Sequence, residues 1–375
     1  MGHKRRAGAG ALVAAALMAL SAIGGVGAAS ATSSASARGR AASAGCNPLQ
    51  QLLGQCSAAS SFTPIATVAV PPTTPTCGGV TIYKSDGTPW QCTFDDEFDA
   101  STGDANALDT NRWTWQTTEA SRIVAGDSPS RACYVNSADN VNVADGTLNL
   151  SARREPFTFK CSYPNGLSWL FGNTTFTTQW TAAQVMGFQK FSQTYGKFEV
   201  RAKLPQTTAV GLQETFWLWP DSPTYYGAWP KSGEIDFAEF YSPFASPSEV
   251  TPYIHYGMDA STRDDATGTN VVSNDDPVNR CAIDLSAYNT YGLEWTPGTL
   301  TVLYNGNVCF IDHYVPNGGL TAPAPFDQPF FLSLTQALGV NIQNFLHPEK
   351  SFDNRATAAT PDVNTTKVEW VRIWR

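Results

Sequence analysis

Three carboxylate side chains lie close together in the middle of the chain, in the stretch Glu234-Ile235-Asp236-Phe237-Ala238-Glu239. The β-branched and aromatic residues between them favour an extended strand. Side chains alternate between the two faces of a strand, so Glu234 and Asp236 share one face and Glu239 would point to the other. A β-bulge, with one extra residue at Phe237-Ala238, would bring Glu239 onto the face of the other two.

Carboxylates in this arrangement suit retaining glycoside hydrolysis, in which one carboxyl attacks the sugar and a second, about 5–5.5 Å away, acts as acid and then as base. At ~3.3 Å per residue, Glu234 and Glu239 lie about 13 Å apart along a bulged strand, and side chains leaning inward over a concave strand close much of that gap. Because like charges this close do not all ionise, we expect one carboxyl to keep its proton near neutral pH and to act as the acid. These residues alone also allow a solvated acidic strand or a calcium site.

The composition favours a β-rich extracellular protein. Hydrophobic residues make up 42% of the 375 residues, charged residues only 15% and aromatic residues 12%, with 30 Gly and 24 Pro. The net charge of −8 argues against nucleic acid or an anionic membrane as the main partner. We therefore expect the protein to bind neither of them, and we also expect it to be a monomer.

The sequence divides into three parts. Residues 1–37 have the pattern of a secretory signal peptide, since the basic residues His3-Lys4-Arg5-Arg6 precede a short apolar run and then small residues. The apolar run is too short to span a membrane stably. We expect residues 38–76, rich in Ala, Ser, Thr and Pro, to form a linker and residues 77–375 to form the domain that carries the acidic strand and any catalytic activity.

Eight cysteines follow the export signal, and their even number implies disulfide bonds. Eight cysteines allow about 105 connectivities, so the sequence alone does not determine the pairing. Pairing each cysteine with its neighbour in sequence would give Cys46–Cys56, Cys77–Cys92, Cys133–Cys161 and Cys281–Cys309.

Strand and turn signals dominate from Cys77 onward. Apolar and charged residues alternate along Gly196–Leu204, which places Phe198 and Val200 on one face of a strand. Asn305-Gly306 is a dipeptide typical of hairpin turns, between two β-rich runs. No long helical period is visible, so the sequence predicts an all-β, two-sheet antiparallel β-sandwich.

Aromatic residues cluster just before the acidic strand and could bind sugar rings by stacking on their apolar faces. Trp229 and Tyr226 lie in a loop rich in Gly and Pro, where we expect them to bind substrate. Phe216 suits core packing, and Trp217 suits either core packing or substrate binding.

Together these segments resemble glycoside hydrolase family 16, in its laminarinase-like branch with the bulged pattern E-x-D-x-x-E. The pattern stands here within Trp229-Pro230-Lys231-Ser232-Gly233-Glu234-Ile235-Asp236-Phe237-Ala238-Glu239. Phe94–Phe98, Tyr195–Pro205, Tyr291–Thr296 and the last strand also match, so the resemblance covers roughly Val80 to Arg375.

The resemblance implies roles for the residues that match. Glu234 would be the nucleophile, Glu239 the acid/base, and Asp236 a hydrogen-bond partner of Glu234. The implied fold is a concanavalin-like β-jelly roll with a substrate cleft across its concave sheet. His255 corresponds to a cleft histidine in similar enzymes, although a satisfied core histidine is the alternative.

Catalysis in this family implies no cofactor. Some members hold a structural calcium, for which the matching positions would be Glu97, Gly146 and Glu369. The usual Asp of the terminal strand is Glu369 here, which weakens that match.

Two segments depart from the family pattern and bear on the substrate. Gln213 and Glu214 stand where many laminarinase-like members carry Trp and Pro. Gln336 lies in the second altered segment, Leu334–Val340, and could serve as a polar cleft residue.

We expect a secreted endo-acting retaining β-glycosidase that hydrolyses β-1,3-glucan. The alternatives are the same chemistry on another β-glucan or a galactan, a transglycosylase with the same residues, and a non-catalytic carbohydrate-binding sandwich. A pure binding module has no chemical need for the set Glu234, Asp236 and Glu239.

Overall fold

The computed structural model describes residues 76–100, 107–164, 172–242, 251–256, 281, 283–316, 319–341 and 353–375. They belong to one compact unit, which includes Thr73–Arg375. The predicted signal peptide, almost all of the linker and the predicted Cys46–Cys56 pair lie outside these residues. Within them, no helix has the length and apolar character needed to cross a membrane.

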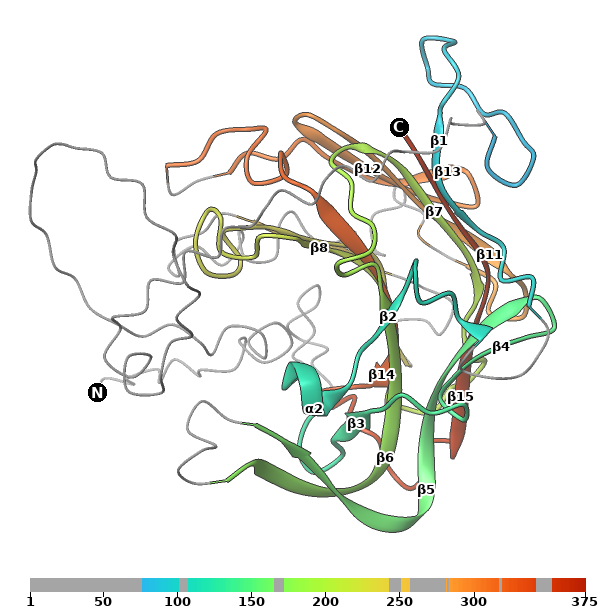
Figure 1. The fold of residues 1–375 in the computed structure, drawn as a ribbon, viewed down its shortest axis with the longest axis vertical. Helices are drawn as coiled ribbons and strands as arrows, with labels where there is room; N and C mark the ends of the chain where they lie inside the picture. The colour runs from blue at the N-terminus through green and yellow to red at the C-terminus, as the bar shows by residue number, and fades with distance from the viewer. Residues whose placement is uncertain are drawn as a thin grey trace, which may run out of the picture. The chain divides into compact units, whose positions relative to one another are not determined.

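Among the described residues, strands account for nearly all of the regular structure, and one short helix, α2 (Thr118–Ser121), accompanies them (Figure 1). The strands are β1 (Cys92–Asp96), β2 (Thr114–Trp115), β3 (Ala132–Tyr134), β4 (Val141–Ala144), β5 (Thr147–Tyr163), β6 (Thr174–Met186), β7 (Gly196–Lys203), β8 (Leu212–Pro220), β9 (Glu234–Tyr241), β10 (Thr251–His255), β11 (Asn289–Thr296), β12 (Thr299–Tyr304), β13 (Asn307–Asp312), β14 (Phe330–Leu338) and β15 (Val363–Trp374).

The strands form two layers that are joined through β6. Hydrogen bonds connect them in the order β10-β9-β8-β14-β6-β5-β15-β7-β11-β12-β13. The first part of β6, Thr174–Thr181, pairs with β5, and Ala183–Met186 pairs with β14, so β6 passes from one layer to the other. Figure 1 shows β5 and β6 side by side, with β15 next to β5 and β14 next to β6.

A hydrophobic core fills the space between the layers. The inward-facing residues of β7, including Phe198 and Val200, are fully buried, as their alternation predicts. Phe216 on β8 contacts Tyr291 on β11, with ring centroids 5.2 Å apart. The predicted two-sheet antiparallel sandwich is confirmed; the described pairings include a single parallel pair, β3 with β6.

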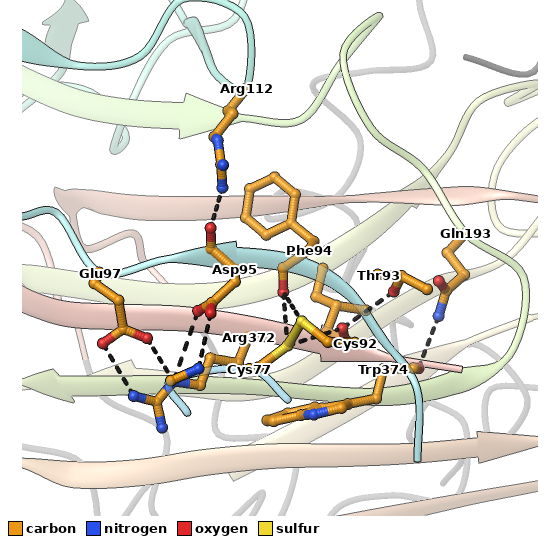
Figure 2. The surroundings of a disulfide bond; sticks show 12 residues. Cys77, Cys92, Thr93, Phe94, Asp95, Glu97, Arg112, Gln193, Arg372 and Trp374 are labelled. Carbon is orange, nitrogen blue, oxygen red and sulfur yellow. Dashed lines mark hydrogen bonds and ion pairs between the residues drawn. A yellow bond between two sulfur atoms is a disulfide. The ribbon is translucent and has the colours of Figure 1, made fainter. Parts of the chain in front are cut away.

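Turn chemistry and disulfides also follow the sequence. Asn305 and Gly306 connect β12 to β13, and both have positive φ (51° and 77°), as the predicted hairpin requires. The predicted pairs Cys77–Cys92, Cys133–Cys161 and Cys281–Cys309 are confirmed. Figure 2 shows the first of them beside β1 and the last strand.

A small polar cluster lies between the two layers and corrects one prediction. Gln336 on β14 is fully buried; its amide donates to Glu214 Oε1 (2.7 Å), and its oxygen accepts from Thr366 on β15 (2.7 Å). The side chain of Gln336 therefore points into the core and not toward a substrate. The alternation of β14 places its neighbour Thr335 on the opposite face.

Glu214 is the ionisable residue of this cluster. Burial raises the pKa of its carboxyl to about 8, against a smaller lowering by the hydrogen bond from Gln336. Its Oε2 has no hydrogen-bond partner among the described residues. The carboxyl is therefore held in its neutral form at neutral pH.

Replacing Glu214 with Gln should change how stability depends on pH. Below the ordinary pKa of 4.5 the carboxyl is protonated in both folded and unfolded chains. As pH rises toward about 8 only the unfolded chain ionises, so this residue destabilises the fold progressively. The free energy of unfolding of Glu214→Gln, relative to wild type, should therefore rise between these pH values in denaturant titrations.

The exposed Glu119 provides the matched control, because Glu119→Gln removes a carboxyl from the surface. A difference between Glu214→Gln and wild type that stays constant with pH would contradict the assignment of a neutral buried carboxyl.

Candidate active site

The strand β9 contains a β-bulge between Asp236 and Glu239. On one side, Thr215 and Phe216 of β8 pair with Glu239 and Ala238, but the next residue, Trp217, pairs with Asp236. The pairing with β10 shifts in the same interval. Phe237 is therefore the extra residue, and the bulge predicted at Phe237-Ala238 is confirmed.

The bulge changes which side chains face the core. Ile235, Phe237 and Ala238 all belong to the core cluster between the layers. Their burial leaves Asp236 and Glu239 on the opposite face of the sheet, despite the odd number of positions between them. We call this face, which carries Glu234, Asp236 and Glu239, the carboxylate face.

A hydrogen bond from the other layer holds the bulge. The hydroxyl of Tyr304 on β12 donates to the backbone carbonyl of Phe237 over 2.9 Å. Tyr304 is only 2% exposed, so this bond lies in the core. It satisfies a buried carbonyl at the point where the regular ladder is interrupted.

Glu234 and Asp236 each have a partner from a neighbouring segment. The indole Nε1–H of Trp229, in the loop before β9, donates to Glu234 Oε2 over 2.6 Å. His255 on β10 lies directly across from Glu234 in the ladder, and its Nε2 is 3.4 Å from Asp236 Oδ2. One ligand atom from each of Glu234, Asp236 and His255 falls within 4.8 Å of the others.

Glu239 is held by two donors. The amide of Gln213 on β8 donates to Glu239 Oε1 over 2.7 Å, and the hydroxyl of Tyr241 donates to the same oxygen over 2.7 Å. Both lone pairs of Oε1 therefore accept hydrogen bonds from protein donors.

Burial dominates the electrostatics of the carboxylate face. Burial, followed by the charge of Asp236, raises the pKa of Glu234 to about 8. Burial and then the charge of Glu239 raise the pKa of Asp236 well above its ordinary value. Burial also raises the pKa of Glu239, although the hydrogen bonds from Tyr241 and Gln213 oppose that rise. All three pKa values are therefore raised, and the value of about 8 for Glu234 agrees with the prediction that one carboxyl keeps its proton near neutral pH.

Candidate metal ligands are engaged in other ways. Cys77, Cys92 and Asp95 lie close together, but the two thiols form a disulfide. For the calcium site implied by the resemblance, Glu97 accepts two hydrogen bonds from Arg372 (Figure 2), and Glu369 pairs with Arg201. Each of these two carboxylates would have to give up its arginine partner before its side chain could bind calcium.

The predicted substrate-binding residues differ in how close they lie to the carboxylates and in how exposed they are. Trp229 and His255 lie against the carboxylates, with ring centroids 5.3 Å apart. Trp217 is on the carboxylate face, because it pairs with Asp236, but it is only 7% exposed and its Nε1–H donates to Thr335. Tyr226 lies three residues before Trp229 in the same loop, and its hydroxyl donates to Asp327 (2.6 Å).

Sequence reasoning missed Gln213 and Tyr241 as partners of Glu239. Gln213 was noted only as a departure from the family pattern, and Tyr241 was not singled out. The signal that the sequence did offer is the position of Tyr241, two residues after Glu239 on the same strand, whereas the contact of Gln213 depends on the pairing of β8 with β9. A residue two positions along a regular strand lies on the same face as Glu239.

The sequence is similar to that of known glycoside hydrolases. The sequence profile of glycosyl hydrolases family 16 matches residues 130–311. A glucan endo-1,3-beta-glucosidase of Cryptopygus antarcticus is 31% identical over 253 residues, which cover 64% of this chain and 80% of that protein. The chain belongs to glycoside hydrolase family 16.

Two further matches extend the comparison. The X-ray structure of the laminarinase from Rhodothermus marinus aligns with a TM-score of 0.51 and 26% identity, over 76% of this chain and 97% of that one. A keratan-sulfate endo-1,4-beta-galactosidase of Sphingobacterium multivorum is 35% identical over a shorter stretch of 158 residues, 42% of this chain and 34% of that protein.

In this family 16 hydrolase, replacing Tyr304 with Phe should damage both stability and catalysis. The change removes the hydroxyl that holds the bulge and leaves the buried carbonyl of Phe237 without this partner. The cost should be about 1–3 kcal/mol in the free energy of unfolding. Glycosidase activity should fall further than stability alone explains, because Glu239 loses its fixed position.

Tyr291→Phe is the matched control for this prediction. Tyr291 is also fully buried and contacts Tyr304, but its hydroxyl has no hydrogen-bond partner among the described residues. Equal behaviour of the two variants in unfolding and activity assays would show that the bond to the bulge is unimportant.

Proposed function

We propose that this protein is a secreted, endo-acting β-1,3-glucanase that cleaves its polysaccharide with retention of configuration. The observation that carries the proposal is the bulge at Phe237, which brings Glu239 onto the same face as Glu234 and Asp236. Retaining hydrolysis needs two carboxyls on one surface, within reach of one sugar.

Glu234 is the nucleophile in this proposal. One of its oxygens attacks the anomeric carbon and forms a glycosyl ester, while the bond to the leaving oxygen breaks. The Trp229 N–H, 2.6 Å from Glu234 Oε2, orients the carboxylate and favours its ionised form.

Glu239 is the acid and then the base. In the first step it donates its proton to the departing glycosidic oxygen. In the second step it takes a proton from the water that attacks the ester, which releases the sugar and restores both carboxyls. Asp236 lies between them in sequence. Its raised pKa allows it to hold a proton, and in that neutral form it repels neither neighbouring carboxylate.

The choice of β-1,3-glucan rests on the relatives. The relative from Cryptopygus antarcticus, which matches this chain over 80% of its own length, is named a glucan endo-1,3-beta-glucosidase. The loop residue Trp229 adds an aromatic surface beside the carboxylates, suited to stacking on a glucose ring.

Secretion is supported by two observations. The first 37 residues have the pattern of a signal peptide. The three disulfides among the described residues also suit an oxidising compartment outside the cytosol.

A galactan is the second candidate substrate. The local match to the keratan-sulfate endo-1,4-beta-galactosidase is higher in identity, though shorter, than the match to the glucanase. The same two carboxylates would perform the same displacement on either polymer.

Reducing-sugar release from laminarin, mixed-linkage β-glucan, agarose and keratan sulfate tests the proposal. We expect release from laminarin by the mature wild-type protein, and a loss of at least a thousandfold in Glu234→Gln, whose amide cannot attack. Unchanged thermal unfolding of the variant would show that the loss is chemical. Release from keratan sulfate alone would transfer the proposal to a galactan, and full activity of Glu234→Gln would refute the assignment of the nucleophile.

The pH dependence of kcat/KM should be bell-shaped and displaced upward. Attack requires ionised Glu234, whose pKa is raised to about 8, so the acid limb should lie well above the ordinary value of 4.5. The apparent values belong to the interacting carboxyls as a set. Initial rates across the pH range check this, and maximal activity near pH 4.5 would contradict it.

A further inference from the structure

Gln213 and Tyr241 contact the proposed acid/base without being reactants themselves. They lie opposite each other in the ladder between β8 and β9, and Glu239 precedes Tyr241 by two positions on the same face. Tyr241 is 2% exposed, so its hydroxyl has little access to water. The three polar groups form a closed triangle beside the catalytic strand.

The hydrogen atoms of this triangle can be assigned one by one. The Gln213 amide has two, and its nitrogen lies 2.7 Å from Glu239 Oε1 and 2.9 Å from the Tyr241 hydroxyl oxygen. The Tyr241 hydroxyl accepts one of these bonds and has one hydrogen of its own, which it donates to Glu239 Oε1 over 2.7 Å.

Every donor in the triangle is therefore used, and both of its bonds to Glu239 end on Oε1. An oxygen that accepts two such hydrogen bonds cannot also carry the acidic proton without displacing a donor. When Glu239 is protonated, the proton must lie on Oε2.

We propose that Gln213 and Tyr241 are positioning residues that direct the transferable proton of Glu239 onto Oε2, the oxygen that serves the glycosidic bond. This rests on the proposed role of Glu239 as acid/base. The strand ladder alone does not provide this selection, because backbone pairing fixes the Cα of Glu239 and leaves its carboxyl free to rotate.

The proposal distinguishes the two oxygens through both steps of the reaction. In the first step the O–H bond at Oε2 breaks as the leaving oxygen gains the proton. The carboxylate that results keeps both donors on Oε1, so Oε2 remains the free base for the incoming water. The same oxygen then regains a proton, and the triangle is unchanged at the end of the cycle.

The pH profile tests the proposal with Gln213→Leu and Tyr241→Phe. Each change removes a donor that opposes the burial-induced rise in the pKa of Glu239, so that pKa should rise further. The alkaline limb of kcat/KM, to which loss of the acid's proton contributes, should move to higher pH, while kcat/KM on laminarin falls roughly tenfold or more. Tyr291→Phe, which removes a buried hydroxyl with no hydrogen-bond partner among the described residues, should leave both unchanged.

A substrate with an activated leaving group separates positioning from a structural defect. A nitrophenyl β-glycoside of laminaribiose needs little proton donation to its leaving group, so kcat/KM on it should fall much less than on laminarin. Equal losses on both substrates, with an unmoved alkaline limb, would overturn the proposal.

Infrared titration of the carboxyl provides a readout that needs no substrate. The band of the protonated Glu239 carboxyl, identified by its absence in Glu239→Gln, should titrate at higher pH in both variants than in wild type. Identical titration in wild type and variants would overturn the proposal even if the enzyme is active. An enzyme inactive on laminarin would refute the proposed function, and the infrared result would still decide the roles of Gln213 and Tyr241.

Discussion

The hydrogen bond from Tyr304 to the backbone carbonyl of Phe237 is the constraint on which the site depends. It joins the layer that contains β12 to the bulge in β9 of the opposite layer. Without the extra residue, the alternation of the strand would direct Glu239 into the core. The core therefore does more than stabilise the fold, because its packing of Phe237 and Ala238 determines which carboxyls reach the surface where chemistry occurs.

Two kinds of buried carboxyl illustrate how surroundings decide the role of a residue. Glu214 lies between the layers with one hydrogen-bond donor, and burial holds it neutral. Glu239 lies on the opposite face of the same sheet, where two donors oppose the effect of burial. In the proposed mechanism Glu239 exchanges its proton during the reaction cycle, whereas Glu214 keeps a proton as part of the core.

Local sequence patterns predicted much of the fold and the core of the site. Alternation identified β7, a dipeptide identified the turn at Asn305-Gly306, and pairing of neighbouring cysteines gave three disulfides correctly. These features depend on short-range chemistry. The bulge was also predictable, because only an extra residue places all three carboxyls on one face.

Long-range contacts were not predictable in the same way. Gln336 was assigned to the substrate surface, but its partner Thr366 is on β15, and the face it occupies depends on the register of β14. The roles of Gln213 and Tyr241 likewise depend on the pairing of β8 with β9. A shift of one residue in either register would exchange the two faces, and sequence alternation in fully buried strands does not specify it.

The most direct test of the central claim is to trap the glycosyl-enzyme intermediate. A 2-deoxy-2-fluoro β-laminaribioside with a good leaving group would slow release of the ester, and peptide mass spectrometry would locate the attached sugar. The account predicts a single labelled peptide with the sugar on Glu234. Attachment to Glu239 or Asp236, or turnover with inverted configuration and no labelled peptide, would contradict it.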